Sequence, residues 1–116
     1  MSPTLKHTNN LGNKRCKPCV AGMTPLSQSE IDGLMLQLEG WHQYDHLISK
    51  TYRFKDYYQT IAFVNAIAWM SHREDHHPGL TVSYNSCHVE YTTHAIHGLS
   101  ENDFICAAKV DNLFNI

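Results

Sequence analysis

Three histidines beside two expected element ends are the residues of this sequence best suited to chemistry. His76 and His77 stand directly before Pro78, and His94 directly follows Thr93. Imidazole titrates at about pH 6.5, so it both donates and accepts protons at cellular pH. If the two element ends meet on one rim of the fold, the three rings line one pocket. Several imidazoles without an evident nucleophile suit proton transfer, such as the addition or removal of water.

The residues alone leave two other uses of the histidines open. A single histidine at the end of an element is usually a solvated or capping residue. A zinc site is the second alternative, because His72 and His76 are four residues apart and would share a helix face. The zinc-peptidase patterns fail, however, since no glutamate directly follows His72 or directly precedes His76. His94 and His97 add candidate ligands, but we expect no bound metal.

Four cysteines add a second group of reactive side chains, at positions 16, 19, 87 and 106. In a reducing compartment we expect free thiols. Cys16 and Cys19 form a single Cys-x-x-Cys, which is half a zinc site without a second pair. Its flanks resemble a tail rather than the strand and helix that frame a redox motif. A metal-binding protein that uses the histidines with Cys16 and Cys19 is therefore the weaker alternative.

The composition of the 116 residues is that of an ordinary globular domain, with 42% hydrophobic and 17% charged residues. The formal net charge of -2 offers no footprint for nucleic acid or for an anionic membrane. No apolar run approaches the ~20 residues of a membrane span. Residues 1–22 also lack the apolar segment of a secretory signal. We expect a cytoplasmic protein.

The sequence predicts a polar, flexible tail over residues 1–22 and one domain over residues 23–116. Ser27 and Glu30 form a capping box that opens the first helix. Gly40 is the expected end of this helix. One apolar stripe marks its buried face, at Ile31, Leu34, Met35 and Leu38.

Two pairs of strands, each followed by one helix, come after this first helix. The expected strands are residues 41–44, 47–54, 80–84 and 87–93, with a turn at Asn85-Ser86. Residues 55–73 form a long helix that is apolar nearly all round from Ile61 to Met70, which predicts a subunit interface. Ser100 opens a final helix with Phe104, Ala107 and Val110 facing inward. The order predicts an α+β fold, a four-stranded antiparallel sheet with three helices packed on one face.

The motifs around the histidines resemble those of the pterin-4a-carbinolamine dehydratases. The resemblance covers residues 23–114 and includes the single Cys-x-x-Cys that bacterial members carry before the domain. Its motifs are Trp41, Phe54-Lys55-Asp56-Tyr57, Asp75-His76-His77-Pro78, Thr93-His94, Gly98-Leu99-Ser100 and Asp103.

The resemblance implies dehydration of 4a-hydroxytetrahydrobiopterin to quinonoid dihydropterin. The product would be recycled for an aromatic amino-acid hydroxylase, usually phenylalanine hydroxylase. It implies no cofactor, because the pterin is the substrate. The implied catalytic residues are His76, His77 and His94, with His77 as the principal acid and base. The implied substrate-binding residues are Asp75, Pro78, Thr92, Thr93, Ala95 and Trp41.

Two positions depart from the family pattern, and both would lie near the pocket rim. His72 replaces a glutamate of many members, and Asn102 replaces an arginine of animal members. The resemblance also implies a homodimer or homotetramer. Animal relatives bind a transcription factor, so an oligomeric binding or regulatory module without catalysis is the second hypothesis.

Overall fold

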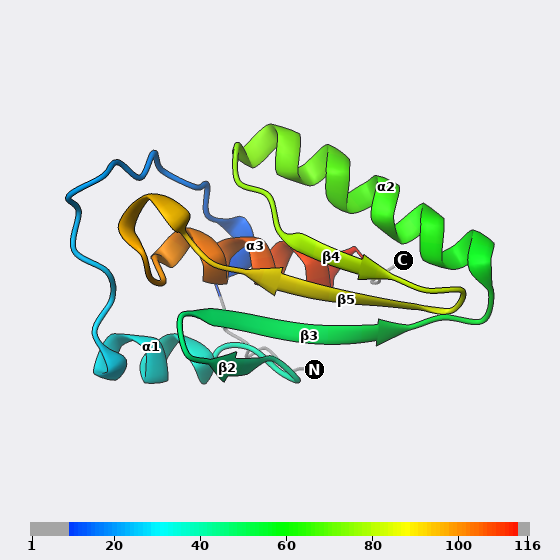
Figure 1. Ribbon diagram of the computed structural model, residues 1–116, viewed down its shortest axis with the longest axis horizontal. Helices are drawn as coiled ribbons and strands as arrows, with labels where there is room; N and C mark the ends of the chain where they lie inside the picture. The colour runs from blue at the N-terminus through cyan, green and yellow to red at the C-terminus, as the bar shows by residue number, and fades with distance from the viewer. Residues whose placement is uncertain (1–9, 114–116) are drawn as a thin grey trace.

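One antiparallel sheet of four strands, in the order β2-β3-β5-β4, is the centre of the fold. The computed structural model describes residues 10–113 (Figure 1). Three helices and this sheet confirm the predicted α+β class. The helices are α1 (Gln28–Met35), α2 (Tyr57–Glu74) and α3 (Glu101–Asn112), with single 3-10 turns η1 (Leu11–Asn13) and η2 (His94–Ile96). The strands are β2 (His42–Tyr44), β3 (Leu47–Arg53), β4 (Gly79–Val82) and β5 (Ser86–Tyr91).

The core lies between the sheet and helices α2 and α3. Alternate residues of β3 and β5 face it, because Ile48 pairs with Tyr91 and Tyr52 pairs with Cys87 in the antiparallel register. Lys50 falls on the same side of β3. Its ammonium donates to the carbonyl of Glu39 and to Asp111 Oδ1, each at 2.9 Å, so the charge on this face is paired. The buried helical side chains opposite include Phe63, Ile67, Phe104, Ala107 and Val110.

Helix α1 begins where the sequence predicts and ends earlier. The Ser27 side chain accepts from the N–H of Glu30, and the Glu30 side chain accepts from the N–H of Ser27, which confirms the capping box. The helix ends at Met35, not at Gly40. Tight turns follow, in which the N–H of Leu38 donates to the carbonyl of Met35. They leave Leu38 packed against the core, and Gly40 takes its positive φ of 82° in the turn before β2.

Helix α2 is bounded by two aspartates. Asp56 caps its start by accepting from the N–H of Gln59, so the helix begins two residues later than expected. Asp75 ends it in the left-handed conformation, with φ 53°. After this reversal the chain passes through His76 and His77 into β4. The end of α2 therefore presents both histidines outside any regular element.

The β4–β5 hairpin turns one residue earlier than expected. The N–H of Ser83 donates to the carbonyl of Ser86 at 2.9 Å, which centres the turn on Tyr84-Asn85. The carbonyl of Tyr84 accepts from Thr60 Oγ1 of α2. This contact to the helix explains why the turn is displaced from Asn85-Ser86.

The described part of the expected tail packs against the domain (Figure 1). Leu11 is only 1% exposed, and η1 lies against α3. Lys109 of α3 donates to the carbonyl of Gly12 at 3.0 Å. Residues 1–9 of the tail, and Phe114, lie outside the described residues. Between residues 10 and 113, no helix is both long enough and apolar enough to span a membrane.

Candidate active site

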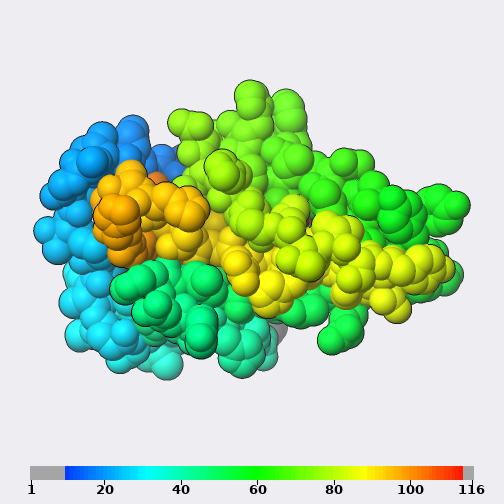
Figure 2. Space-filling view, viewed as in Figure 1, coloured from blue at the N-terminus to red at the C-terminus, as the bar shows by residue number. Residues whose placement is uncertain are grey.

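A pocket of about 440 Å³ lies where the loops after α2 and β5 meet the N-terminal segment. Its size is within the range of small-molecule sites, roughly 300–1,000 Å³. Figure 2 shows the blue N-terminal segment beside the orange loop that carries η2. The lining residues are Cys16, Lys17, Pro18, Cys19, Arg73, Glu74, Asp75, His76, His77, Thr92, Thr93, His94, Ala95 and Asn102.

His76 is the most constrained residue of the pocket. Its Nε2 lies 2.7 Å from Asp103 Oδ1, and its ring stacks on Tyr91 with centroids 5.7 Å apart and planes 11° apart. A carboxylate only accepts hydrogen bonds, so Nε2 carries the proton and Nδ1 is left as the acceptor of the neutral ring. The side chain of His76 is 13% exposed. Both its orientation and its tautomer are therefore held by the fold.

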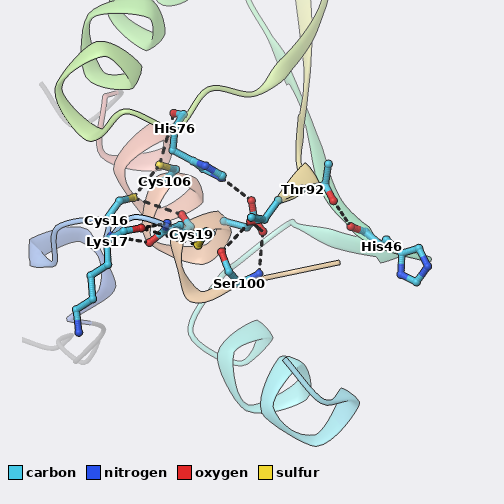
Figure 3. Close-up of polar contacts among 11 residues, drawn as sticks. Cys16, Lys17, Cys19, His46, His76, Thr92, Ser100 and Cys106 are labelled. Carbon is cyan, nitrogen blue, oxygen red and sulfur yellow. Dashed lines mark hydrogen bonds and ion pairs between the residues drawn. The ribbon is translucent and has the colours of Figure 1, made fainter. Parts of the chain in front are cut away.

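Asp103 is fully buried and accepts three hydrogen bonds, two of them from His76 and Ser100, which Figure 3 labels. Besides His76, its donors are Thr93 Oγ1 at 2.7 Å and the N–H of Ser100 at 3.0 Å. The Ser100 contact is half of the capping box that starts α3. From the sequence, Asp103 is one of the motifs of the resemblance and is not among the expected site residues. Its spacing from Ser100 was the available signal, and the proximity to His76 is a product of the tertiary fold.

His77 and His94 line the same pocket from two different loops. His77 follows His76 before β4, and His94 is the first residue of η2 after β5. Both side chains are exposed. Thr92 Oγ1 donates to the carbonyl of His46 at 2.6 Å, which ties the loop after β5 to the β2–β3 turn. The three histidines named from the sequence thus share one pocket, together with Asp75, Thr92, Thr93 and Ala95.

Trp41 and Pro78, the other two expected substrate contacts, do not line this pocket. Trp41 is 5% exposed and lies in the core, where its Nε1–H donates to Asp111 Oδ2 at 3.1 Å. Aromatic packing against Tyr52 and Tyr91 holds it there. Pro78 lines an adjoining hollow beside α2, which shares Asp75, His76 and His77 with the pocket.

His72 lies in that adjoining hollow and does not line the pocket that contains all three histidines. Its ring packs beside Trp69, with centroids 5.8 Å apart, whereas His76 is bonded to Asp103. The two histidines thus have different partners, although they are four residues apart. Within residues 10–113, no three His, Cys, Asp or Glu side chains are grouped so that they could hold a metal ion.

The N-terminal wall of the pocket was not expected from the sequence. The N–H of Cys16 donates to Glu74 Oε1 at 2.8 Å, and Arg15 and Lys109 both lie near Glu74 Oε2. Burial raises the pKa of Glu74, but the N–H of Cys16 and the charges of Lys109 and Arg15 outweigh burial. The net pKa of Glu74 lies below its ordinary value of 4.5.

Two comparisons of sequence place the chain in a family. Residues 24–113 match the profile of the family described as Pterin 4 alpha carbinolamine dehydratase. The chain therefore belongs to the pterin-4a-carbinolamine dehydratase family, and is a hydro-lyase by class. A relative from Nitrosospira multiformis is 66% identical over 93% of this chain and 96% of its own. One from Nitrosomonas eutropha is 63% identical over 90% and 93%, and both carry the provisional name pterin-4-alpha-carbinolamine dehydratase.

Two solved structures share the fold. A transcriptional coactivator/pterin dehydratase from Brucella melitensis is 28% identical, with a TM-score of 0.75 over 78% of this chain and 98% of its own. A pterin dehydratase-like protein described as a RuBisCO assembly factor in the alpha-carboxysome is 27% identical, with a TM-score of 0.57 over 65% and 89%.

Proposed function

We propose that the pocket dehydrates 4a-hydroxytetrahydrobiopterin to quinonoid dihydropterin, with His76, His77 and His94 transferring the protons. The observation that supports this most directly is the shared pocket of the three imidazoles, one of them held by a buried carboxylate. The proposed reaction breaks the C4a–O bond and the N5–H bond. The hydroxyl leaves as water after gaining a proton, and the N5–H electron pair forms the new C=N bond.

The two proton transfers need two groups in different protonation states. One group gives a proton to the departing hydroxyl, and another accepts the proton from N5. Each positioned acid or base contributes roughly 10²–10⁴-fold to the rate. In our proposal His77 is the principal acid and base, while His76 and His94 place the hydroxyl and protonate it.

The His76–Asp103 pair supports a role for His76 in this chemistry. A carboxylate beside an imidazole fixes the tautomer and stabilises the imidazolium that forms when the ring takes up a proton. The partner here is fully buried, so the pair is shielded from water on the side of the core. His76 is therefore proposed as the fixed member of the three, around which the pterin is oriented.

The test is a direct dehydratase assay. Phenylalanine hydroxylase generates 4a-hydroxytetrahydrobiopterin in the cuvette, and its decay is followed with and without the purified chain. We expect faster decay with the wild type and a loss of about 10²–10⁴-fold in kcat for His77→Ala. His42→Ala is the matched control, because His42 is exposed on β2 and lines neither of the two hollows that contain His77. Unchanged decay with folded wild-type protein would refute the proposal.

We also propose a homo-oligomer, a dimer or tetramer, that contacts through the outer face of α2. Tyr58 is 81% exposed and Trp69 is 65% exposed on this helix. Large exposed aromatic side chains on one surface favour a protein contact. Light scattering on the wild type and on Trp69→Glu tests this, with a lower mass expected for the variant. A monomeric wild type would contradict it.

The cellular setting is proposed on the same basis. A cytoplasmic dehydratase would return the pterin to an aromatic amino-acid hydroxylase, usually phenylalanine hydroxylase. The alternative is a binding module without catalysis, which the similarity to a RuBisCO assembly factor favours. The dehydratase assay separates the two functions, since a pure binding module would leave the decay of the carbinolamine unchanged.

A further inference from the structure

The Cys-x-x-Cys segment lines the pocket, but no step of the proposed reaction uses its residues. Cys16, Lys17, Pro18 and Cys19 form the part of the pocket wall contributed by the N-terminal segment, while the histidines lie on the loops after α2 and β5. Figure 3 shows the segment passing beside Cys106 of α3, below His76. The segment lies ahead of residues 24–113, the part of the chain that matches the family profile. Its contacts therefore show how this chain completes its pocket.

Asn102 binds the backbone of this segment through both ends of its side-chain amide. Its Oδ1 accepts from the N–H of Lys17 at 3.0 Å, and its Nδ2–H donates to the carbonyl of Lys17 at 2.6 Å. The same Nδ2 lies 3.3 Å from Cys19 Sγ. Asn102 is 7% exposed, so this paired contact is largely shielded from water. A side chain that satisfies both backbone groups of one residue fixes that residue in place.

Two further contacts hold the segment on its other side. Glu74, whose side chain is 5% exposed, accepts from the N–H of Cys16. The Cys16 thiol lies 3.5 Å from the buried thiol of Cys106, at the level of the α3 turn that follows Asn102. Three buried or partly buried groups thus position a stretch of four residues. This is more anchoring than a solvent-exposed linker needs.

We infer that residues 16–19 are a fixed wall of the pterin site and that Asn102 is the positioning residue that holds this wall against the ligand. The inference rests on the proposed function, since it takes the histidine pocket as the pterin site. The wall sets affinity rather than chemistry, because the contacts that hold residues 16–19 come from Glu74 and from Asn102 and Cys106 of α3, and not from a proton-transferring histidine. Asn102, at the position where animal members carry arginine, thus acts through the segment and not on the reacting atoms.

The test combines kinetics, ligand binding and amide exchange on the full chain. Asn102→Ala removes two hydrogen bonds to Lys17, so we expect KM and the Kd for 7,8-dihydrobiopterin to rise by up to about thirtyfold. We expect kcat to change by less than about threefold, since no proton-transfer group is altered. Lys14→Ala is the matched control. It breaks the exposed Lys14–Glu101 ion pair, two residues before the segment, and should leave KM unchanged.

Hydrogen exchange gives a readout that a purely structural role would not move. In the wild type, 7,8-dihydrobiopterin should slow amide exchange in the peptide that contains Cys16, Lys17 and Cys19, as well as around His76 and His94. In Asn102→Ala the same peptide should exchange faster without ligand. Ligand protection around the histidines but not in this peptide would overturn the inference. So would an Asn102→Ala variant with a released segment and an unchanged KM, or with a segment as protected as in the wild type.

Failure of the proposed function would look different. In that case the wild type would neither dehydrate the carbinolamine nor bind 7,8-dihydrobiopterin, whatever the exchange of the N-terminal peptide. Pterin binding with normal kcat, and no response at residues 16–19, would instead contradict only the role of the wall. The two results are therefore separable in one set of measurements.

Discussion

Replacing Asp103 by asparagine separates the catalytic use of a buried carboxylate from its structural use. The carboxylate accepts from His76, Thr93 and the N–H of Ser100, at 2.7, 2.7 and 3.0 Å. An amide keeps one acceptor oxygen and gains an NH₂ group that faces at least one of these donors. Either His76 must change tautomer, or the contact to the N–H of Ser100 is lost and the Thr93 hydroxyl must accept instead of donate. Asp103→Asn therefore cannot preserve all three contacts with His76 in its present tautomer.

The size of the effect follows from these contacts. A hydrogen bond to a charged group contributes about 1.5–3 kcal/mol, and a helix cap about 0.5–2 kcal/mol. We expect Asp103→Asn to lower the free energy of unfolding by about 2–4 kcal/mol, which a domain of ordinary stability survives. If His76 loses its orientation, kcat falls by roughly 10²–10⁴-fold, the contribution of one positioned acid or base.

The assay measures kcat for carbinolamine decay at a temperature well below the melting temperature of each variant. Imidazole nitrogen NMR shifts report the tautomer of His76. Asp111→Asn is the matched control, because Asp111 also accepts from three donors, namely Trp41, Lys50 and Tyr52, outside the pocket. We expect Asp111→Asn to lower stability and leave kcat unchanged. An active wild type whose Asp103→Asn variant is folded and keeps kcat within about threefold would refute the role given to His76 and Asp103.

The remaining predictions concern stability. Tyr91 Oη is buried without a hydrogen-bond partner among the described residues, so Tyr91→Phe should raise the free energy of unfolding by up to about 1 kcal/mol. Tyr52→Phe removes a donor to Asp111 and should lower the free energy of unfolding by about 1.5–3 kcal/mol. Chemical denaturation measures both variants, and equal changes in the two would contradict the different roles given to the two hydroxyls. Against the effect of burial, the N–H of Cys16 and the charges of Lys109 and Arg15 lower the pKa of Glu74 in the folded state. The ionised Glu74 therefore stabilises the fold at neutral pH and loses this effect as the pH falls below about 4.5. The stability difference between wild type and Glu74→Gln should therefore vanish in acid, and a difference that grows in acid would contradict it.

Much of the fold could be predicted because its signals are local. The capping box of Ser27 and Glu30 marks the start of α1 through contacts three residues apart. Alternation of side chains puts Ile48 and Tyr52 on one face of β3, and that face is buried. The wrong boundaries lie where distant contacts compete, as at the β4–β5 turn, where Thr60 of α2 binds the carbonyl of Tyr84. Local propensity carries no information on such a contact.

The residues of the histidine pocket could likewise be predicted only in part. The types and spacing of the residues, with the resemblance they carry, were sufficient to name His76, His77 and His94. They were not sufficient to exclude Trp41 from the pocket, because a tryptophan that completes a core and one that closes a pocket have the same local pattern. The contacts to Tyr52, Tyr91 and Asp111 decide this.

The sequence by itself determined the α+β class, the element order and the three histidines at element ends. Only the tertiary structure decided that Asp103, 27 positions after His76, orients that ring. It also decided that residues 16–19 lie against Asn102, 85 positions from Lys17. The physical reason is that hydrophobic periodicity and caps depend on neighbours within a few residues. The partners of a buried polar group depend on which elements the core brings together.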